Sequence, residues 1–414
     1  MGIAPARSLA FEVLRLVETG GYAADLLASR AAGLDQRDAG LASEIVLGTL
    51  RRQNQLDFLL EHFSGRPAGR LDPEVRIALR MGLYQLRYLD RIPAHAAVSE
   101  SVELVKRAGK HSAGGLVNAV LRKVHRQPVS FPDLATELGH PAWLLERWVR
   151  QFGPEQARRI ALANLEAPET YVRIPVGYDS SLAEATRRES YPTAGLEPTE
   201  VPGCFRVLEG NPAGWRIQDI SSQAIVPLLE LAPGQWFLDV CAAPGNKTAQ
   251  ALESKVRAVA CDVHPRRLAA LKTLGCDLVV ADGTRTLPFA RRFDRILVDA
   301  PCSGTGTLAR NPEIKWRLRP SDLVDLHARQ VALLGNALER LAPGGRLVYS
   351  TCSLEAEENE EVVREVLDST AIPAAVAPWW RRLPGRDRGD GFFAAVITSE
   401  EPLNDSNRSF DSLG

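Results

Sequence analysis

Two cysteines stand in short turn sequences, each of which follows a run of β-forming residues. Cys302 lies in DAPCSGTG (299–306) and Cys352 lies in YSTCS (349–353). If the two runs are neighbouring parallel strands, their carboxyl ends lie about 4.8 Å apart and both thiols face one cleft. A thiolate is a soft nucleophile that forms covalent intermediates. The pattern therefore predicts a covalent site, but position alone does not say which cysteine attacks.

Methyl transfer to carbon 5 of a cytosine is a reaction that needs such a thiolate. Carbon 5 is too weak a nucleophile to attack a sulfonium methyl group, and thiolate addition at carbon 6 activates it. A carboxyl group near N3 of the base assists the addition, and Asp299 is placed to supply one. The structural alternative is that both cysteines are buried core thiols. That simpler role is assigned to the other four cysteines, Cys204, Cys241, Cys261 and Cys276.

A second group of residues suits an adenosine cofactor. The loop DVCAAPGNKT (239–248) joins a β-rich run to a helical one, so its backbone N–H groups can approach a ligand. Asp262 ends the next predicted strand, where it can accept hydrogen bonds from ribose hydroxyls, and Asp282 ends the third, where it can bind the base. The loop has one glycine, Gly245, where the dinucleotide fingerprint has three. This favours a cofactor without phosphate, such as S-adenosylmethionine, although an ordinary turn beside a solvated Asp262 has the same pattern.

The elements that must position these residues follow two patterns. Apolar residues recur at helical spacing over 5–127, and Asp72-Pro73 is typical of a helix start, which predicts a bundle of five to seven helices. From about residue 216, β-rich runs alternate with helices, which predicts a mostly parallel, doubly wound α/β sheet. The predicted strands are Trp236–Val240, Ala258–Asp262, Leu278–Asp282, Arg295–Asp299, Arg346–Ser350 and Phe392–Ile397.

These patterns predict a multidomain chain. The predicted segments are an all-α bundle (1–127), a linker near Gln127-Pro128 with a small mixed α/β subdomain (128–215), an α/β catalytic domain (216–399) and a disordered tail (400–414).

Composition excludes several protein classes. The chain of 414 residues has no run of about 18 apolar residues, so we expect no membrane span. Its first twenty residues are typical of an amphipathic helix and not of a secretion signal. None of the six cysteines forms a C-x-x-C pair, which argues against a metal site or a disulfide framework and favours the cytoplasm. Residues 1–130 carry 18 basic and 13 acidic side chains, a modest excess that permits RNA binding.

Three motifs together resemble the NOL1/NOP2/Sun family of RNA cytosine-5 methyltransferases. They are DVCAAPGNKT, DAPCSGTGTLARNPEIKW and PGGRLVYSTCSLEAEENE, and the resemblance spans about 170–397. It implies a Rossmann-like domain that uses S-adenosylmethionine. The first 127 residues are similar to the NusB RNA-binding fold, through EIVLGTLRRQNQLD (44–57), IALRMGLYQLRYLDRIPAHAAVSESVELVK (77–106) and GLVNAVLRKV (115–124). Together the two parts look like those family members that methylate bacterial 16S rRNA.

The resemblance also implies roles for individual residues. Cys352, in the Thr-Cys motif, would be the nucleophile, and Cys302, in the Pro-Cys motif, would help release the product, with Asp299 and Lys247 completing the catalytic set. DNA cytosine-5 methyltransferases use the Pro-Cys thiol, so the Thr-Cys motif points to RNA. The implied cofactor contacts are Cys241, Ala242, Ala243, Pro244, Gly245, Asn246, Lys247, Asp262, Arg267, Asp282, Gly283 and Asp299. The implied partner is 16S rRNA or its assembly intermediate, with cytosine 967 as the target, and a monomer is expected.

Two positions depart from the family's pattern. Gly245-Asn246-Lys247 stands where the family has Gly-Gly-Lys, and because Asn tolerates left-handed backbone we expect cofactor binding to survive. Arg173 matches the start of the Arg-x-Asn that opens the family's RNA-contacting subdomain, but Ile174-Pro175 replaces the polar continuation. This second departure affects the details of RNA contact more than the chemistry.

Other functions fit parts of the pattern. One is methylation of tRNA or of another rRNA cytosine, a second is a non-catalytic RNA-binding factor in ribosome assembly, and a third is an NAD-dependent oxidoreductase. The complete set of site residues argues against the second, and the glycine-poor loop argues against the third. Cofactor binding separates the first two from the third, and Cys352 reactivity separates the first from the second.

The helical region has its own alternative, a structural cap without an RNA role, because a charge run is more often a solvated face. If the region binds RNA, the expected contacts are Arg51, Arg52, Arg122, Lys123 and Arg126.

Overall fold

The computed structural model describes residues 2–124, 129–175, 195–210, 212 and 214–400. The predicted linker near Gln127-Pro128, Arg126 and nearly all of the predicted tail lie outside the described residues. The chain forms two compact units. The helical unit comprises Met1–Pro168, Thr307–Leu318 and Pro384–Arg386, and the sheet unit comprises Glu169–Gly306, Arg319–Leu383 and Asp387–Gly414. The predicted division into three domains and a tail remains a prediction.

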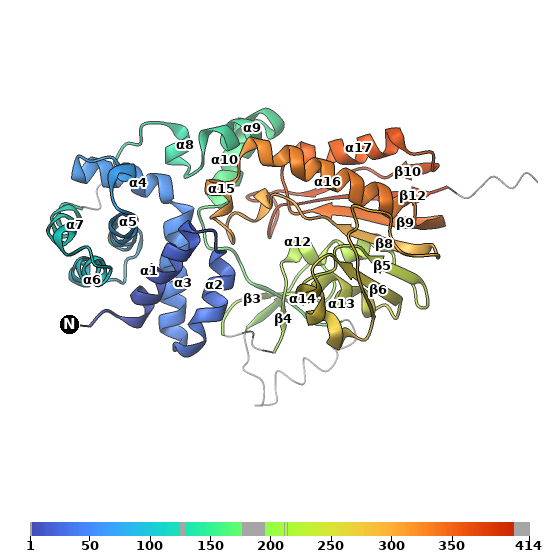
Figure 1. The fold of residues 1–414 in the computed structure, drawn as a ribbon, viewed down its shortest axis with the longest axis horizontal. Helices are drawn as coiled ribbons and strands as arrows, with labels where there is room; N and C mark the ends of the chain where they lie inside the picture. The colour runs from blue at the N-terminus through green and yellow to red at the C-terminus, as the bar shows by residue number, and fades with distance from the viewer. Residues whose placement is uncertain (1, 125–128, 176–194, 211, 213, 401–414) are drawn as a thin grey trace, which may run out of the picture. The chain divides into compact units, whose positions relative to one another are not determined.

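The helical unit confirms the predicted bundle. Its first helix begins with a proline at the first position and buries the apolar stripe that includes Leu9, Val13 and Leu14. As predicted, another helix begins at Pro73. The α-helices of this unit are α1 (Pro5–Glu18), α2 (Ala23–Arg30), α3 (Gln36–Arg51), α4 (Gln53–Ser64), α5 (Pro73–Tyr88), α6 (Ala94–Arg107), α7 (Gly114–Arg122), α8 (Leu134–Glu137), α9 (Ala142–Phe152), α10 (Pro154–Ala163) and α15 (Ile314–Arg317) (Figure 1).

The main sheet of the second unit is mostly parallel, as predicted. The strands lie in the order β10-β12-β9-β8-β5-β6-β7, and β11 pairs with β12. Strands β5 to β9 pair in parallel, whereas β12 runs antiparallel to β9. The strands are β5 (Trp236–Asp239), β6 (Arg257–Asp262), β7 (Asp277–Val280), β8 (Phe293–Asp299), β9 (Leu341–Thr351), β10 (Ala374–Val376), β11 (Trp380–Arg382) and β12 (Phe392–Ser399).

Helices connect the strands of this sheet and bury its apolar residues in cores that include Phe237, Tyr349 and Phe393 (Figure 1). They are α12 (Ile220–Gln223), α13 (Asn246–Leu252), α14 (Pro265–Leu268), α16 (Pro320–Leu338) and α17 (Glu360–Ser369). Because β5 has β6 on one side and β8 on the other, the strand order reverses at β5. In open α/β sheets, ligands bind beyond the carboxyl ends of the strands at such a reversal.

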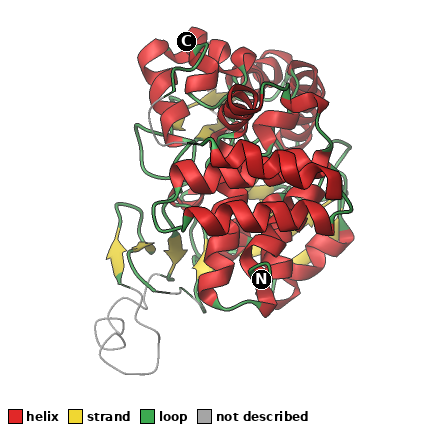
Figure 2. Cartoon of the chain, turned by 90° about the vertical axis from the view of Figure 1, so that its left-hand side faces the viewer, coloured by secondary structure: helices red, strands yellow, loops and turns green. Residues whose placement is uncertain are grey.

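A second, antiparallel sheet precedes the main one in the chain. Its order is β2-β3-β1-β4, formed by β1 (Tyr171–Arg173), β2 (Leu196–Pro198), β3 (Cys204–Val207) and β4 (Arg216–Ile217), and its short strands are yellow in Figure 2. Arg173 is buried and donates two hydrogen bonds to the carboxylate of Glu253, at 2.9 and 2.6 Å. This guanidinium therefore fastens β1 to the end of α13, in spite of its match to an RNA-contacting motif.

Among the described residues, no helix has the length and hydropathy needed to cross a lipid bilayer.

Candidate active site

The carboxyl ends of β8 and β9 bring the two cysteines together. The strands are parallel neighbours in which Asp299 lies opposite Ser350. Three residues beyond Asp299 the chain reaches Cys302, and two beyond Ser350 it reaches Cys352. The two sulfur atoms, Sγ to Sγ, are 3.4 Å apart. The predicted neighbourhood of the two thiols is therefore present.

Close backbone packing holds the turn that carries Cys302. The amide of Gly306 donates to the carbonyl of Cys352 at 2.8 Å, and the amide of Gly391 donates to the carbonyl of Gly306 at 2.8 Å. A Cβ atom at residue 306 would lie 2.2 Å from the Gly391 carbonyl oxygen. Only glycine fits at this position, which explains the glycine-rich sequence after Cys302.

A buried carboxylate, Glu358, fastens both cysteine turns. Its Oε1 accepts from the Ser303 amide at 2.7 Å and from the Gln330 side chain at 3.1 Å, and its Oε2 accepts from the hydroxyls of Ser303 and Ser353. Ser303 follows Cys302 and Ser353 follows Cys352, so one side chain fixes the residue after each thiol. The neighbouring Asn359 accepts from Thr351 Oγ1 and donates to the Ser353 carbonyl at 3.0 Å.

Sequence reasoning assigned no role to Glu358 or Asn359. The signal was that the run EENE stands at the end of the third family motif, but an acidic run by itself is usually a solvated helix start.

The two thiols share a hydrogen bond and are both partly buried. A hydrogen bond with Cys352, together with burial, raises the pKa of Cys302 well above its usual range. Either sulfur atom can be the donor in the hydrogen bond between the two cysteines. Burial raises the pKa of Cys204 to about 11 and that of Cys261 to about 12, and it raises the pKa of Cys241 and Cys276. All six cysteines are free.

Asp299 forms an ion pair at the end of β8. The Lys247 ammonium group donates to its Oδ2 at 2.7 Å, and Ser350 Oγ donates to its Oδ1 at 2.8 Å. The same ammonium group lies 5.2 Å from the centre of the Phe392 ring. Two of the predicted catalytic residues, Asp299 and Lys247, are therefore in direct contact.

The predicted cofactor loop folds around Gly245. This residue has φ +103°, and a Cβ atom there would lie 2.7 Å from the Leu271 side chain, so glycine is required. Asn246 is the first residue of α13, and no non-glycine residue of this loop has a positive φ. Asn246 therefore does not need the tolerance of left-handed backbone on which the expectation of cofactor binding relied, because the helix begins there and Gly245 makes the turn; cofactor binding itself remains a prediction.

The rest of the predicted cofactor set lies at the ends of β5, β6 and β7. Asp262, at the end of β6, accepts from the amides of Ala243 (3.2 Å) and His264 (2.8 Å), and Arg267 donates to the Ala243 carbonyl at 3.2 Å. Cys241, Ala242 and Pro244 complete the loop between β5 and α13.

The end of β7 carries the last two predicted contacts. Asp282 is exposed, and hydrogen bonds from the Thr284 hydroxyl and amide lower its pKa. A Cβ at Gly283 would lie within 2.8 Å of side chains from Leu333 and Val240. Strand β7 ends at Val280, two residues earlier than predicted.

The chemistry of these groups fits an adenosine cofactor without phosphates. The strand ends offer the carboxylates of Asp262 and Asp282, and buried Asp239 has an Oδ1 with no hydrogen-bond partner among the described residues. Carboxylates accept from hydroxyl and amino groups and repel phosphate. The described residues contain no cluster of histidine, cysteine and acidic side chains that could hold a metal ion.

The predicted RNA contacts of the helical unit differ in how exposed their side chains are: Arg51 is buried, Arg52 is partly buried, and Arg122 and Lys123 are exposed. Arg51 is buried, and its Nε donates to the Ala309 carbonyl at 2.8 Å, so it holds the unit together and does not face a ligand. The Arg52 guanidinium lies 4.5 Å from the centre of the Tyr88 ring.

Two protein families match different parts of the chain. The family described as 16S rRNA methyltransferase RsmB/F matches residues 226–398, and the NusB family matches residues 4–126. The ribosomal RNA small subunit methyltransferase B of Klebsiella pneumoniae (strain 342) is 35% identical, over 94% of this chain and 97% of that protein. Its namesake from Escherichia coli O17:K52:H18 is 34% identical, over 94% of this chain and 98% of that protein.

Solved structures extend the comparison. The crystal structure of PH0851 aligns with a TM-score of 0.79 at 22% identity and covers 96% of this chain and 99% of that one, which shows a shared fold. A methyltransferase homolog protein from Pyrococcus horikoshii aligns with a TM-score of 0.54 at 27% identity, over 64% of this chain and 97% of that one.

Proposed function

This chain belongs to the RsmB/F family of 16S rRNA methyltransferases, and from that premise we propose that it methylates carbon 5 of a 16S rRNA cytosine through a covalent adduct with Cys352. The chain is an S-adenosylmethionine-dependent RNA methyltransferase, as the members of this family are. The observation that carries the proposal is the 3.4 Å contact between Cys302 and Cys352 at the ends of neighbouring parallel strands.

The proposed reaction begins with Cys352. Its thiolate adds to carbon 6 of the cytosine, which forms the C6–Sγ bond and makes carbon 5 nucleophilic. A proton or a hydrogen bond at N3 favours this addition, and we assign that role to the carboxyl group of Asp299, whose Oδ2 accepts from the Lys247 ammonium group at 2.7 Å. S-adenosylmethionine supplies the electrophilic methyl group when bound.

Product release reverses the addition. A base removes the carbon 5 proton, the C6–Sγ bond breaks, and its electron pair returns to Cys352 as a thiolate. The contact between the two sulfur atoms supports a role for Cys302 here, because a thiol at 3.4 Å can donate a hydrogen bond to the departing sulfur. In this proposal Cys352 attacks and Cys302 assists release.

The finer parts of the proposal concern the substrate and the cofactor contacts. The target is cytosine 967, flipped out of its helix because carbon 6 must be approached from the face of the ring. The helical unit helps to place the rRNA. The loop 241–247, Asp262, Arg267, Asp282, Gly283 and Asp299 hold the cofactor.

The test is methyl transfer to protein-free 16S rRNA with methyl-labelled S-adenosylmethionine, followed by bisulfite sequencing of the RNA. We expect one 5-methylcytosine with the wild-type protein and none with Cys352→Ala. Label in tRNA but not in 16S rRNA would contradict the proposed substrate. Full activity of Cys352→Ala would contradict the proposed nucleophile.

A further inference from the structure

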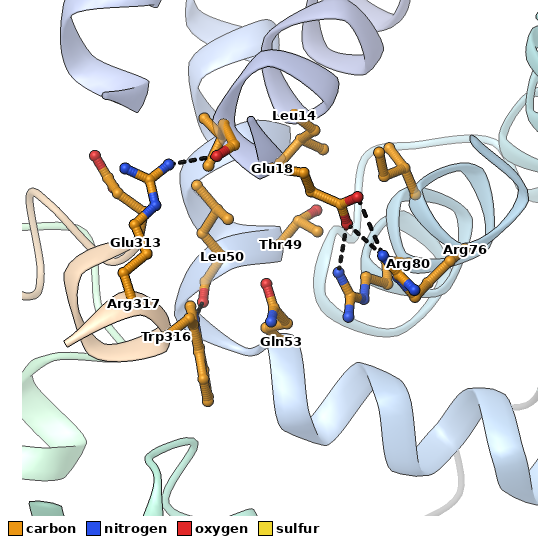
Figure 3. A pocket seen from close by; sticks show the side chains of 12 residues that line it. Leu14, Glu18, Thr49, Leu50, Gln53, Arg76, Arg80, Glu313, Trp316 and Arg317 are labelled. Carbon is orange, nitrogen blue, oxygen red and sulfur yellow. Dashed lines mark hydrogen bonds and ion pairs between the residues drawn. The ribbon is translucent and has the colours of Figure 1, made fainter. Parts of the chain in front are cut away.

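A pocket of about 310 Å³ lies within the helical unit, apart from the cysteine site. Helices α1, α3, α4 and α5 line it together with the segment 307–318, which includes α15 (Figure 3). Figure 3 shows Glu18, Thr49 and Gln53, from three of these helices, around the same space. The reaction proposed above uses none of these residues.

Three polar atoms of this pocket are buried and lack a hydrogen-bond partner among the described residues. They are Thr49 Oγ1, Arg76 Nε and Glu313 Oε2. Thr49 is 2% exposed and Glu313 is 1% exposed. A buried polar group without a partner is costly, and such groups are rare in folded proteins. Three of them in one pocket indicate a site that takes a polar ligand.

The remaining atoms of two of these side chains are fixed, so the free atoms have a defined direction. Glu313 Oε1 accepts from the Ala23 amide at 3.0 Å, and Arg76 Nη2 donates to the Glu18 carboxylate at 3.0 and 3.1 Å. The pocket therefore offers one fixed acceptor, Glu313 Oε2, and one fixed donor, Arg76 Nε. The hydroxyl of Thr49 can act as either.

The pocket combines these polar atoms with an aromatic ring and with arginines, two of which, Arg76 and Arg80, are paired with the carboxylates of Glu18 and Asp57. Trp316 Nε1 donates to the Leu50 carbonyl at 2.7 Å, which fixes the indole ring. Three arginines and two glutamates line the pocket. A flat ligand with a donor and an acceptor on its edge, attached to a phosphate, matches this combination. A nucleotide whose base carries an amino group has these features, and aromatic side chains stack on unpaired bases.

We propose that this pocket binds one unpaired nucleotide of the rRNA substrate, whose base amino group donates to Glu313 Oε2. The inference rests on the proposed function, because it takes its ligand from the RNA substrate. It assigns the segment 307–318 a role in recognition, and this segment is continuous in sequence with the Cys302 turn.

The test is the dissociation constant of the full-length protein for protein-free 16S rRNA at several salt concentrations. Glu313→Gln keeps an acceptor for the Ala23 amide but removes the carboxylate. We expect it to weaken binding by about tenfold, as for one hydrogen bond to a charged group, without changing the salt dependence. The matched control is Glu146→Gln on an exposed position of α9 in the same unit. It removes the same charge and should leave binding unchanged or slightly tighter.

A second variant guards against a folding effect. Thr49→Val keeps the shape of the side chain and should weaken binding by about threefold with no loss in thermal stability. Equal affinity of Glu313→Gln and Glu146→Gln would overturn the inference, as would failure of the wild-type protein to bind this rRNA. Methyl transfer is measured on the same samples. If the wild-type protein methylates the rRNA but Glu313→Gln binds it as tightly as the wild type, the inference about the pocket is wrong and the proposed function stands. If Glu313→Gln binds more weakly as expected but the wild-type protein transfers no methyl group, the proposed function is wrong and the inference about the pocket stands.

Discussion

The cysteine turns and the pocket of the helical unit treat their buried polar groups in opposite ways. Around the cysteines, the side chains of Ser303, Ser353 and Glu358 satisfy one another in a closed network, to which Gln330 also donates, although Gln330 Oε1 has no partner among the described residues. In the pocket, Thr49 and Glu313 each have a buried atom with no hydrogen-bond partner among the described residues. A closed hydrogen-bond network fixes the positions of its side chains before a substrate binds. Buried polar atoms without a partner in the protein can instead form hydrogen bonds with a ligand. The first arrangement suits chemistry and the second suits recognition.

The largest expected effect comes from opening the closed network. Glu358→Gln places an amide N–H₂ among the donors of Ser303 and Ser353, so both cysteine turns should shift. A misplacement of about 1 Å costs roughly 100-fold in rate, so we expect kcat to fall about 100-fold while KM for rRNA changes little. Steady-state methyl transfer measures both constants.

The matched control for this positioning residue is Glu361→Gln, an exposed position in α17. It should behave as the wild type. A variant at residue 358 that raised KM and spared kcat would show that Glu358 acts on binding and not on the geometry of the thiols.

The next effect tests the backbone contact beside the thiols. Gly306→Ala puts a Cβ atom against the Gly391 carbonyl, so we expect a loss of about 2 kcal/mol or more in the free energy of unfolding. Gly335→Ala in α16 is the control, because nothing lies within 4 Å of its Cβ position. It should stabilise the helix by about 0.5–1 kcal/mol. Urea denaturation compares them, and equal stabilities would contradict the close packing at Gly306.

Two buried threonines compare the regions directly. Thr351 Oγ1 donates to Asn359 and accepts from the Ser353 amide, whereas Thr49 Oγ1 has no partner among the described residues. Thr351→Val should therefore cost about 1–3 kcal/mol, and Thr49→Val should cost nothing or stabilise by up to about 1 kcal/mol. Thermal unfolding without RNA measures both variants. If both variants lost the same free energy of unfolding, the two threonines would not differ in hydrogen bonding as described.

The smallest effect concerns pH and the helices around Glu358. Although partial burial lowers the pKa of His327, hydrogen bonds to the Glu357 carbonyl and the Glu365 carboxylate outweigh it and raise that pKa above its usual value. A raised histidine pKa gives stability that is fully present below the unfolded pKa, near 6.5, and is lost as pH rises through the folded pKa. Because His327 is only partly buried and Glu365 is exposed, solvent screens the pair and we expect less than about 0.5 kcal/mol.

His327→Gln should abolish this small pH dependence. The test is the free energy of unfolding of the wild type and of His327→Gln, measured between pH 5 and pH 9 and plotted against pH. An unchanged slope in the variant would assign the dependence to another group.

Features of the fold that depend on the local spacing of residues could be predicted from the sequence. The strand–turn sequences placed Asp299, Cys302 and Cys352 at the ends of two strands, and the periodicity change near residue 216 separated helices from sheet. Both follow from spacing along the chain, because side-chain direction in helices and strands is periodic.

Contacts between distant residues could not be predicted in this way. Arg51 was expected at the surface but is buried, because the segment 307–318 packs against it across more than 250 residues of sequence. Glu358 stands in an acidic run that resembles a solvated helix start, and only the tertiary fold brings it under Ser303. The pocket at Glu313 depends on the same distant segment, so no local pattern indicates it.

The proposed mechanism depends on the different roles of the two thiols, and trapping the covalent intermediate distinguishes these roles. Wild type, Cys352→Ala and Cys302→Ala are each incubated with 16S rRNA and S-adenosylmethionine, and RNA–protein adducts are separated under denaturing conditions. We predict that Cys302→Ala accumulates a stable adduct, because attack proceeds and release is impaired, and that Cys352→Ala forms none. An adduct with Cys352→Ala, or loss of activity without any adduct in Cys302→Ala, would contradict the assignment of Cys352 as the nucleophile.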